Sequence, residues 1–108
     1  MKVAVIGSRG LTANVGEYIP DECHEIVSGG AKGIDKCAEI FAVERRLKLT
    51  VFLPDYQRYG RGAPIVRNKQ IVDYADFVLA FWDGISRGTK SVIDYCKKSG
   101  KECRVIKI

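Results

Sequence analysis

The sequence has no apolar run that approaches the ~18 residues a membrane-spanning segment needs. It also shows no export leader, because the apolar stretch in Met1–Gly7 is too short and no cleavage-like site follows it. Such a stretch is more typical of a first β-strand. We therefore expect a cytoplasmic protein with no membrane partner.

Metal-binding and disulfide patterns are missing as well. The four cysteines form no Cys-x-x-Cys pair, and the single histidine, His24, directly follows Cys23. Metal sites use ligands at short spacing, and disulfide-built domains carry a denser set of cysteines. A Cys23–His24 nucleophile is disfavoured because adjacent side chains point apart on a regular element. The sequence predicts reduced core thiols, no metal site and no resident cofactor.

Two familiar phosphate-binding signatures are absent. No Gly-x-Gly-x-x-Gly follows the first predicted strand, and no Gly-x-x-x-x-Gly-Lys-Ser/Thr loop occurs anywhere. These absences argue against the usual dinucleotide fingerprint and against ATP hydrolysis of the Walker type. The net charge of +5 is compatible with an anionic ligand, with nucleic acid or with a merely soluble surface.

What the sequence does contain is a regular alternation of apolar runs and helical patterns. Short apolar runs predict five strands, at residues 3–6, 25–28, 49–53, 77–81 and 105–108. Apolar residues at helical spacing predict four helices, at residues 11–19, 34–45, 64–75 and 89–98. Asp35 is expected on the outer face at the head of the second helix, where it either complements the helix dipole or bonds a ribose hydroxyl. Asp83 either bonds a sugar or an amino group or shapes its turn, and residues 55–62 are expected to form a functional loop. Residues 1–108 therefore predict a single α/β domain, a Rossmann-like three-layer fold with a five-stranded parallel sheet and helices on both faces.

Glycine-rich turns follow three of the predicted strands, at residues 7–10, 29–33 and 84–88. In a parallel sheet such turns meet at one edge, where ligands bind at the point at which the strand order reverses. Glycine lets the backbone approach an anion closely, and the following helix start adds free N–H groups. Tight turns also need glycine without any ligand, but three turns at one edge favour a phosphate site. The candidate ligand-binding residues are Gly7, Ser8, Arg9, Ser28, Gly29, Gly30, Ala31, Gly33, Asp35, Arg67, Asn68, Trp82, Asp83, Gly84, Ser86, Gly88 and Thr89.

Basic and aromatic residues are expected at the same edge. Arg67 and Asn68 are placed in the first turn of the third helix, where a guanidinium can hold a phosphate with two hydrogen bonds. The aromatic side chains of Tyr56, Tyr59 and Trp82 could stack on a base or simply pack in the core. The basic residues form either a ligand-binding rim or a solvated surface: Arg9, Lys32, Arg58, Arg61, Arg67, Lys69, Arg87 and Lys90.

Three segments together resemble the SLOG superfamily: Gly7–Arg9, the run Ser28–Asp35 (SGGAKGID), and the pair Arg67–Asn68. This group includes the DNA-processing protein A family, the cytokinin-activating phosphoribohydrolases and the YpsA-like proteins. The resemblance covers nearly the whole chain and is strongest to small stand-alone YpsA-related members, which are regarded as ligand sensors. It implies a Rossmann-like fold that binds nucleotides or nucleotide-derived ligands at these loops.

The chain departs from its enzymatic and DNA-binding look-alikes in specific ways. The phosphoribohydrolases carry a Pro-Gly-Gly-x-Gly-Thr-x-x-Glu motif whose glutamate assists glycosidic-bond cleavage, but the matching position here is Val92. Asp94 is a poor substitute because it lies about 200° round the helix from Val92. The DNA-processing proteins share the Arg-Asn pair, but this chain lacks their additional domains and their longer preceding insert.

Three hypotheses follow. The preferred one is a non-catalytic binding module, of the sensor kind, for a nucleotide or ADP-ribose-like molecule. In it the glycine turns and Thr89 hold the phosphate and Arg67 pairs with it. The second is a nucleotide-processing enzyme, an N-glycosidase or phosphohydrolase that uses Asp35 or Asp83 as the acid or base. The third is a single-stranded nucleic-acid binder that uses the basic rim and the loop aromatics. Homo-oligomer formation stays open, because no face of the sequence marks it.

Overall fold

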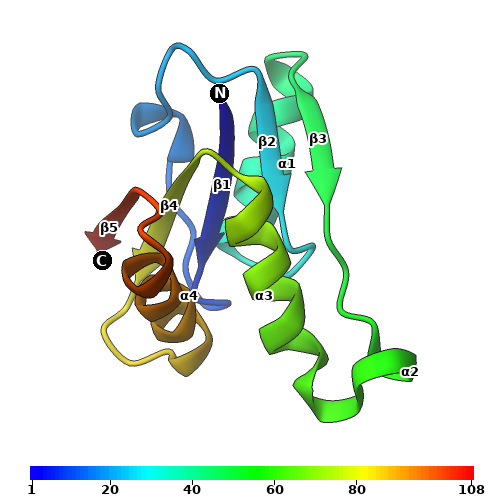
Figure 1. Cartoon of the computed structure of the whole chain (residues 1–108). Coiled ribbons are helices and arrows are strands. Elements are labelled where there is room, and N and C mark those ends of the chain that lie inside the picture. The colour runs from blue at the N-terminus through cyan, green and yellow to red at the C-terminus, as the bar shows by residue number, and fades with distance from the viewer.

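The computed structural model describes all residues, 1–108, as a five-stranded parallel sheet with helices on both faces (Figure 1). The strand order is β3-β2-β1-β4-β5. The strands are β1 (Lys2–Gly7), β2 (Glu25–Ser28), β3 (Lys48–Val51), β4 (Phe77–Trp82) and β5 (Cys103–Lys107). The principal helices are α1 (Ile34–Glu44), α3 (Ala63–Tyr74) and α4 (Arg87–Ser99). The predicted fold class is confirmed.

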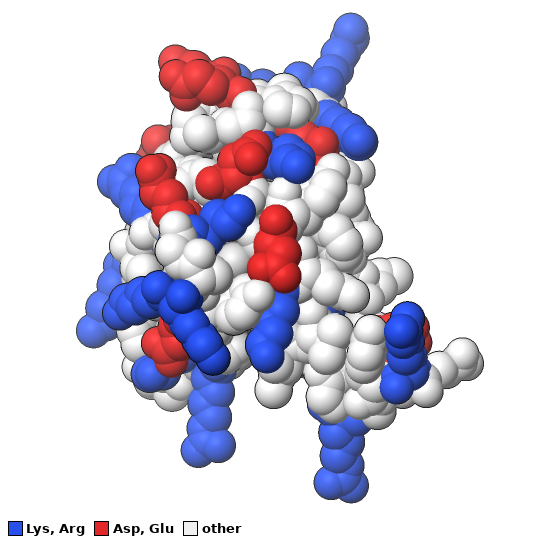
Figure 2. All heavy atoms as spheres, in the orientation of Figure 1, with Lys and Arg blue, Asp and Glu red and all other residues white.

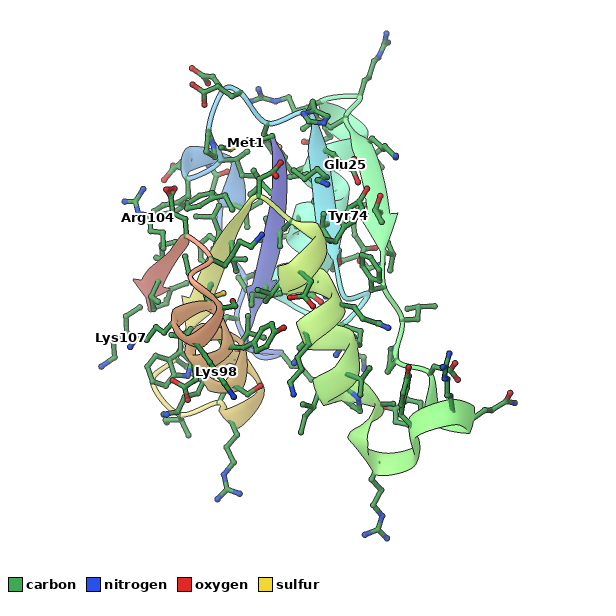
Figure 3. The ribbon with its side chains drawn as sticks, viewed as in Figure 1. Met1, Glu25, Tyr74, Lys98, Arg104 and Lys107 are labelled. Atoms are coloured by element: carbon green, nitrogen blue, oxygen red, sulfur yellow. The ribbon has the colours of Figure 1, made fainter.

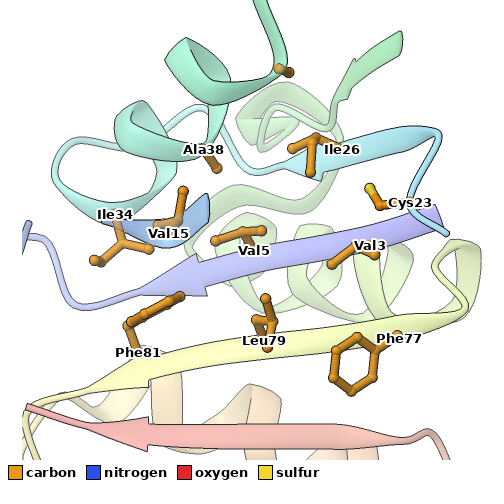
Figure 4. Close-up of a cluster of buried hydrophobic side chains, with 11 residues drawn as sticks. Val3, Val5, Val15, Cys23, Ile26, Ile34, Ala38, Phe77, Leu79 and Phe81 are labelled. Atoms are coloured by element: carbon orange, nitrogen blue, oxygen red, sulfur yellow. The ribbon is translucent and has the colours of Figure 1, made fainter. Parts of the chain in front are cut away.

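The central strands β1 and β4 are buried on both faces because helices cover them on each side. Residues with alternate parity along a strand therefore enter two different cores. Val3 and Val5 join the core beneath α1, which also contains Leu79 and Phe81 of β4 (Figure 4). The neighbouring residues of the same strands point to the opposite core, under α3 and α4: Ala4, Ile6, Val78 and Ala80. Each fully buried large side chain of this kind stabilises the fold by roughly 1.5–3 kcal/mol.

The first predicted helix, at residues 11–19, is wrong. The crossover from β1 to β2 contains only a single 3₁₀ turn, η1 (Val15–Glu17). Its apolar residues are still used, because Val15 is buried and the Tyr18 ring packs edge-on against Phe81 at 5.4 Å. A Cβ on Gly16 would lie 2.8 Å from the Phe41 ring of α1, so this connection packs too closely for a regular helix surface. The apolar residues at helical spacing are therefore buried, although the segment does not form an α-helix.

The stretch expected to be a loop, residues 55–62, is instead folded. It contains the short helix α2 (Tyr56–Tyr59) and the 3₁₀ turn η2 (Gly60–Gly62), which runs directly into α3. Asp55 caps α2, since its carboxylate accepts a hydrogen bond from the Arg58 amide at 3.2 Å. In Figure 1, α2 projects beyond the end of β3, away from the sheet.

Strand limits differ slightly from the predicted ones. β3 ends at Val51, two residues before the predicted end, and β5 starts at Cys103, two residues before the predicted start. α1 ends at Glu44 and α3 begins at Ala63. Because of that earlier start, Arg67 and Asn68 lie in the second turn of α3, not in its first.

Candidate functional site

A cavity opens at the carboxyl edge of the sheet, beside the ends of β1 and β4. The chain leaves β1 towards β2 and β3 on one side and then crosses back to β4 and β5 on the other, so the strand order reverses between the neighbours β1 and β4. The cavity has a volume of about 410 Å³. Its lining comes from all the segments that meet at this edge: Ile6, Gly7, Ser8, Arg9, Gly10, Ala31, Asp35, Pro64, Arg67, Asn68, Asp83, Ser86, Gly88, Thr89 and Val92.

Most of the predicted site residues lie in this lining, and a smaller group does not. Those that line it are Gly7, Ser8, Arg9, Ala31, Asp35, Arg67, Asn68, Asp83, Ser86, Gly88 and Thr89. Those outside it are Ser28, Gly29, Gly30, Gly33, Trp82 and Gly84. Sequence reasoning missed Ile6, Gly10, Pro64 and Val92, although Gly10 belongs to a turn that it had singled out.

The start of α4 presents unpaired backbone donors to the cavity. Ser86 is the N-cap, and its side chain makes no capping bond to the backbone. The amides of Arg87, Gly88 and Thr89 find no acceptor within the chain, whereas Lys90 is the first to bond back, to the Ser86 carbonyl. Free amides and the positive end of the helix dipole together form an anion site.

Gly88 makes this helix start unusually accessible. It is the second residue of α4, and a Cβ placed on it would meet no atom within 4 Å. Glycine within a helix costs about 0.5–1 kcal/mol relative to alanine. Nothing in the packing of the chain requires glycine here, and Gly88 is one of the residues that line the cavity.

Ser8 lines the same cavity, and its hydroxyl is buried. Ser8 is 4 % exposed, and its Oγ is the one buried side-chain polar atom that the chain leaves unpaired. Its backbone is well anchored, since the amide donates to the Phe81 carbonyl and its own carbonyl accepts from Leu11. Buried hydroxyls are nearly always paired, because an unpaired one costs roughly 1–3 kcal/mol. A donor or acceptor from outside the chain would satisfy it.

Asp83 shapes the turn that leads into α4. Its Oδ1 accepts hydrogen bonds from the amides of Ser86 at 2.7 Å and Ile85 at 2.8 Å. These bonds hold the pKa of the Asp83 carboxyl below its usual value, and the nearby Ser8 hydroxyl adds a smaller effect in the same direction. The carboxylate therefore positions the loop and keeps a negative charge beside the cavity.

The start of α1 is arranged differently, because the chain itself fills it. Gly33 caps α1 with a φ of +74°, and a Cβ there would lie 2.4 Å from the Arg9 carbonyl oxygen. A Cβ on Gly7 would lie 2.5 Å from Ile34 Cγ1. These two glycines let the β1 turn and the α1 start pack against each other, so a ligand is not needed to explain them.

Asp35 lies at the boundary between the closed α1 start and the cavity. It was expected on the outer face of its helix, which is wrong: it is 4 % exposed. Its Oδ2 accepts a hydrogen bond from the Ala31 amide at 3.2 Å. Burial raises the pKa of the Asp35 carboxyl, although the Ala31 bond and the charge of Arg67 act in the opposite direction.

Arg67 reaches across from α3 to the β2 turn. Its Nη1 donates to the Gly29 carbonyl at 2.6 Å, and its Nε donates to Asn68 Oδ1 at 2.9 Å. Burial lowers the pKa of the Arg67 guanidinium, while the negative charge of Asp35 raises it. Two of the guanidinium N–H groups are thus used in bonds that link α3 to the β2 turn and to Asn68. The guanidinium also brings one positive charge to the cavity wall.

The predicted residues outside the cavity have roles within the fold. The Ser28 hydroxyl donates to Glu39 at 2.9 Å and accepts from the Gly30 amide at 3.1 Å. The Trp82 indole donates to the Ser86 carbonyl at 3.0 Å, which ties β4 to the cap of α4. Gly84 adopts a φ of +83°.

The basic rim contributes less to the cavity than its residue count indicated. Arg9 and Arg67 line the cavity, but Lys90 pairs with Asp94 at 2.9 Å on the solvent side of α4. Figure 2 shows basic side chains projecting at the lower edge of the molecule and both signs of charge mixed over the rest of this face. Tyr56 and Tyr59 are exposed on α2 and do not line the cavity.

Val92 occupies the wall of the cavity at the position where the phosphoribohydrolase motif has its glutamate. It is buried, and its side chain supplies no proton-transfer group. Asp94, with its side chain 55 % exposed, points to solvent towards Lys90. The carboxylates that do line the cavity are Asp35 and Asp83.

No group of three or more His, Cys, Asp and Glu side chains is placed to hold a metal ion. No helix has the length and apolar character that crossing a bilayer requires. Comparisons with protein-family models, with curated proteins and with solved structures find no match to this chain.

Proposed function

We propose that this protein is a binding module for a small, phosphate-bearing, nucleotide-like ligand, held at the carboxyl edge of the sheet between β1 and β4. Ser8 carries the proposal, because it lines the cavity that the open start of α4 also faces, and its buried hydroxyl has only the nearby Asp83 carboxylate beside it. A phosphate oxygen there would accept from Ser8 and from the first amides of α4.

The surroundings support an anion of limited size. The amides of Arg87, Gly88 and Thr89 are free, and Arg9 adds a positive charge to the lining. The volume of about 410 Å³ lies at the lower end of the range for small-molecule sites, which suits a mononucleotide better than a larger cofactor. The resemblance to the SLOG superfamily points to the same class of ligand.

A non-catalytic role fits the side chains that face the cavity. Asp83 is committed to the turn, and Val92 is apolar, so neither is arranged as a general acid next to the proposed phosphate position. The proposed function is therefore recognition, of the kind that a ligand sensor needs.

The test is a binding titration with matched variants. Inorganic phosphate, AMP, ADP-ribose and a single-stranded oligonucleotide are titrated calorimetrically into wild type, Ser8→Ala and Gly88→Ala. We expect each variant to bind AMP about tenfold or more weakly, because Ser8→Ala removes a hydrogen bond to a charged group and Gly88→Ala fills the phosphate approach.

Two control variants keep the experiment specific. Gly62→Ala adds the same methyl group in open space away from the cavity, and Ser99→Ala removes a hydroxyl that bonds the Tyr95 carbonyl at the far end of α4. Both should bind as wild type does. The proposal is overturned if no phosphate compound binds wild type, or if Gly88→Ala and Gly62→Ala bind equally well.

A further inference from the structure

Asp35 has accepting capacity that the chain does not use. The carboxylate is 4 % exposed, and only backbone amides serve it: Ala31 donates to Oδ2 at 3.2 Å, and the Gly29 amide lies near enough to lower the pKa. No lysine or arginine nitrogen lies within 4.0 Å of it. A carboxylate can accept about four hydrogen bonds, and a buried one is costly when they are not made.

Arg67 lies close to Asp35 but does not pair with it. A Cβ on Gly29 would lie 3.0 Å from both Asp35 Oδ2 and Arg67 Nη1, so the two groups lie close to each other beside that residue. The guanidinium donates instead to the Gly29 carbonyl and to Asn68. Its charge nevertheless disfavours a second cation beside Asp35.

The chain's other buried carboxylate, Glu25, accepts hydrogen bonds from neighbouring side chains. Glu25, 3 % exposed, accepts from the Tyr74 hydroxyl at 2.6 Å (both are labelled in Figure 3). It also accepts from the Thr50 hydroxyl at 2.7 Å. Lys48 lies 3.8 Å away. Burial alone would raise the pKa of Glu25, but these donors outweigh it and lower the pKa. Side chains satisfy Glu25, whereas no side chain satisfies Asp35.

We propose that Asp35 is a specificity residue that accepts hydrogen bonds from hydroxyl groups of the ligand, which is therefore a phosphate ester of a sugar or other polyol. The inference rests on the proposed phosphate site at α4. Both groups line one cavity, so a ligand can place its phosphate at Ser8 and Gly88 and its hydroxyls at Asp35.

Charge favours neutral donors such as hydroxyls over cationic ones and limits the phosphate count. An ammonium group at Asp35 would lie next to Arg67 and be repelled. A polyphosphate would bring further negative charge towards Asp35 and Asp83, which line the same cavity. A monophosphate with free hydroxyls avoids both conflicts.

The experiment compares ligands that differ in their hydroxyls alone. AMP and 2′,3′-dideoxy-AMP are titrated into wild type, Asp35→Asn and Asp83→Asn, with inorganic phosphate as the reference anion. In wild type, loss of the hydroxyls should weaken binding about tenfold. In Asp35→Asn the two nucleotides should bind within about twofold of each other, because the amide oxygen stays with Ala31 and its NH₂ replaces the acceptor. Asp83→Asn should keep the wild-type discrimination.

The results test the role of Asp35 and the phosphate site separately. Equal discrimination in wild type and Asp35→Asn overturns the role of Asp35 while leaving the phosphate site in place. Binding of inorganic phosphate as tight as that of AMP also overturns it. If neither phosphate nor AMP binds wild type, the proposed function fails and this inference fails with it. Circular dichroism and urea unfolding of Asp35→Asn show whether the variant is folded.

Discussion

The helices α1 and α4 begin at the same edge of the sheet, each after a glycine-containing turn, yet the two starts are built in opposite ways. At α1 the chain fills its own helix start, with the Arg9 carbonyl against Gly33 and Ile34 against Gly7. Neither helix bonds its first three amides within the chain, but at α4 a Cβ on Gly88 would meet no atom within 4 Å. One start is a packing joint, and the other is open.

The same contrast separates the serines at the two strand ends. Ser28, at the end of β2, donates to Glu39 and accepts from Gly30. Ser8, just after β1, has only the Asp83 carboxylate near its hydroxyl. Two serines in similar Gly-containing turns thus differ in how far the fold satisfies their polar groups.

The largest expected effect comes from placing the same methyl group at the two helix starts. Gly33→Ala should destabilise the protein by roughly 3–5 kcal/mol or prevent folding, since it combines a positive φ with a backbone clash. Gly88→Ala should leave the fold intact and stabilise it by about 0.5–1 kcal/mol. Urea unfolding of the two variants measures both. Equal destabilisation at the two positions would show that the α4 start is packed as tightly as the α1 start.

Much of the fold follows from the sequence because buried parallel strands leave an unambiguous signal. Uninterrupted apolar runs such as Val3–Ile6 and Phe77–Phe81 can be placed in the centre of a parallel sheet without further knowledge. The weaker pattern at residues 11–19 predicted a helix that does not form. At Val15 and Tyr18 the apolar spacing described contact with the core, although the intervening Gly16 packs against α1 and the chain makes a single turn.

The sequence predicts the carboxyl edge of the sheet as the place of the candidate site. It does not predict which polar groups there are hydrogen-bonded or buried. The sequence shows that Ser8 and Ser28 follow strands, yet hydrogen-bond satisfaction depends on partners such as Glu39, which lies eleven residues from Ser28. The burial of Asp35 depends likewise on loops that fold over it. Local pattern cannot report either property, because both arise from long-range packing.

A second test removes the two hydroxyls. Ser28→Ala should cost about 1–3 kcal/mol, because it leaves the Gly30 amide without its acceptor and Glu39 without the Ser28 hydroxyl. Ser8→Ala should be neutral or stabilising by up to about 1 kcal/mol, because it removes an unpaired buried hydroxyl. Thermal and urea unfolding in the absence of ligand give the two values. A loss of stability in Ser8→Ala that matches Ser28→Ala would show that Ser8 serves the fold.

The smallest effect concerns pH and compares two buried carboxyls. Burial raises the pKa of Asp35 above its ordinary value of 3.8, so the folded protein holds this proton more tightly than the unfolded chain does. Stability therefore falls as pH rises from about that value through the raised pKa. Asp35→Asn should remove this fall and be more stable than wild type near neutral pH.

Glu25→Gln should be less stable than wild type near neutral pH. The hydrogen-bonded Glu25 carboxylate, with its lowered pKa, contributes stability above pH 4.5 that the amide loses. Urea unfolding between pH 3 and pH 7 resolves the two slopes. Slopes of the same sign would mean that Asp35 is satisfied within the chain and has no accepting capacity left for a ligand.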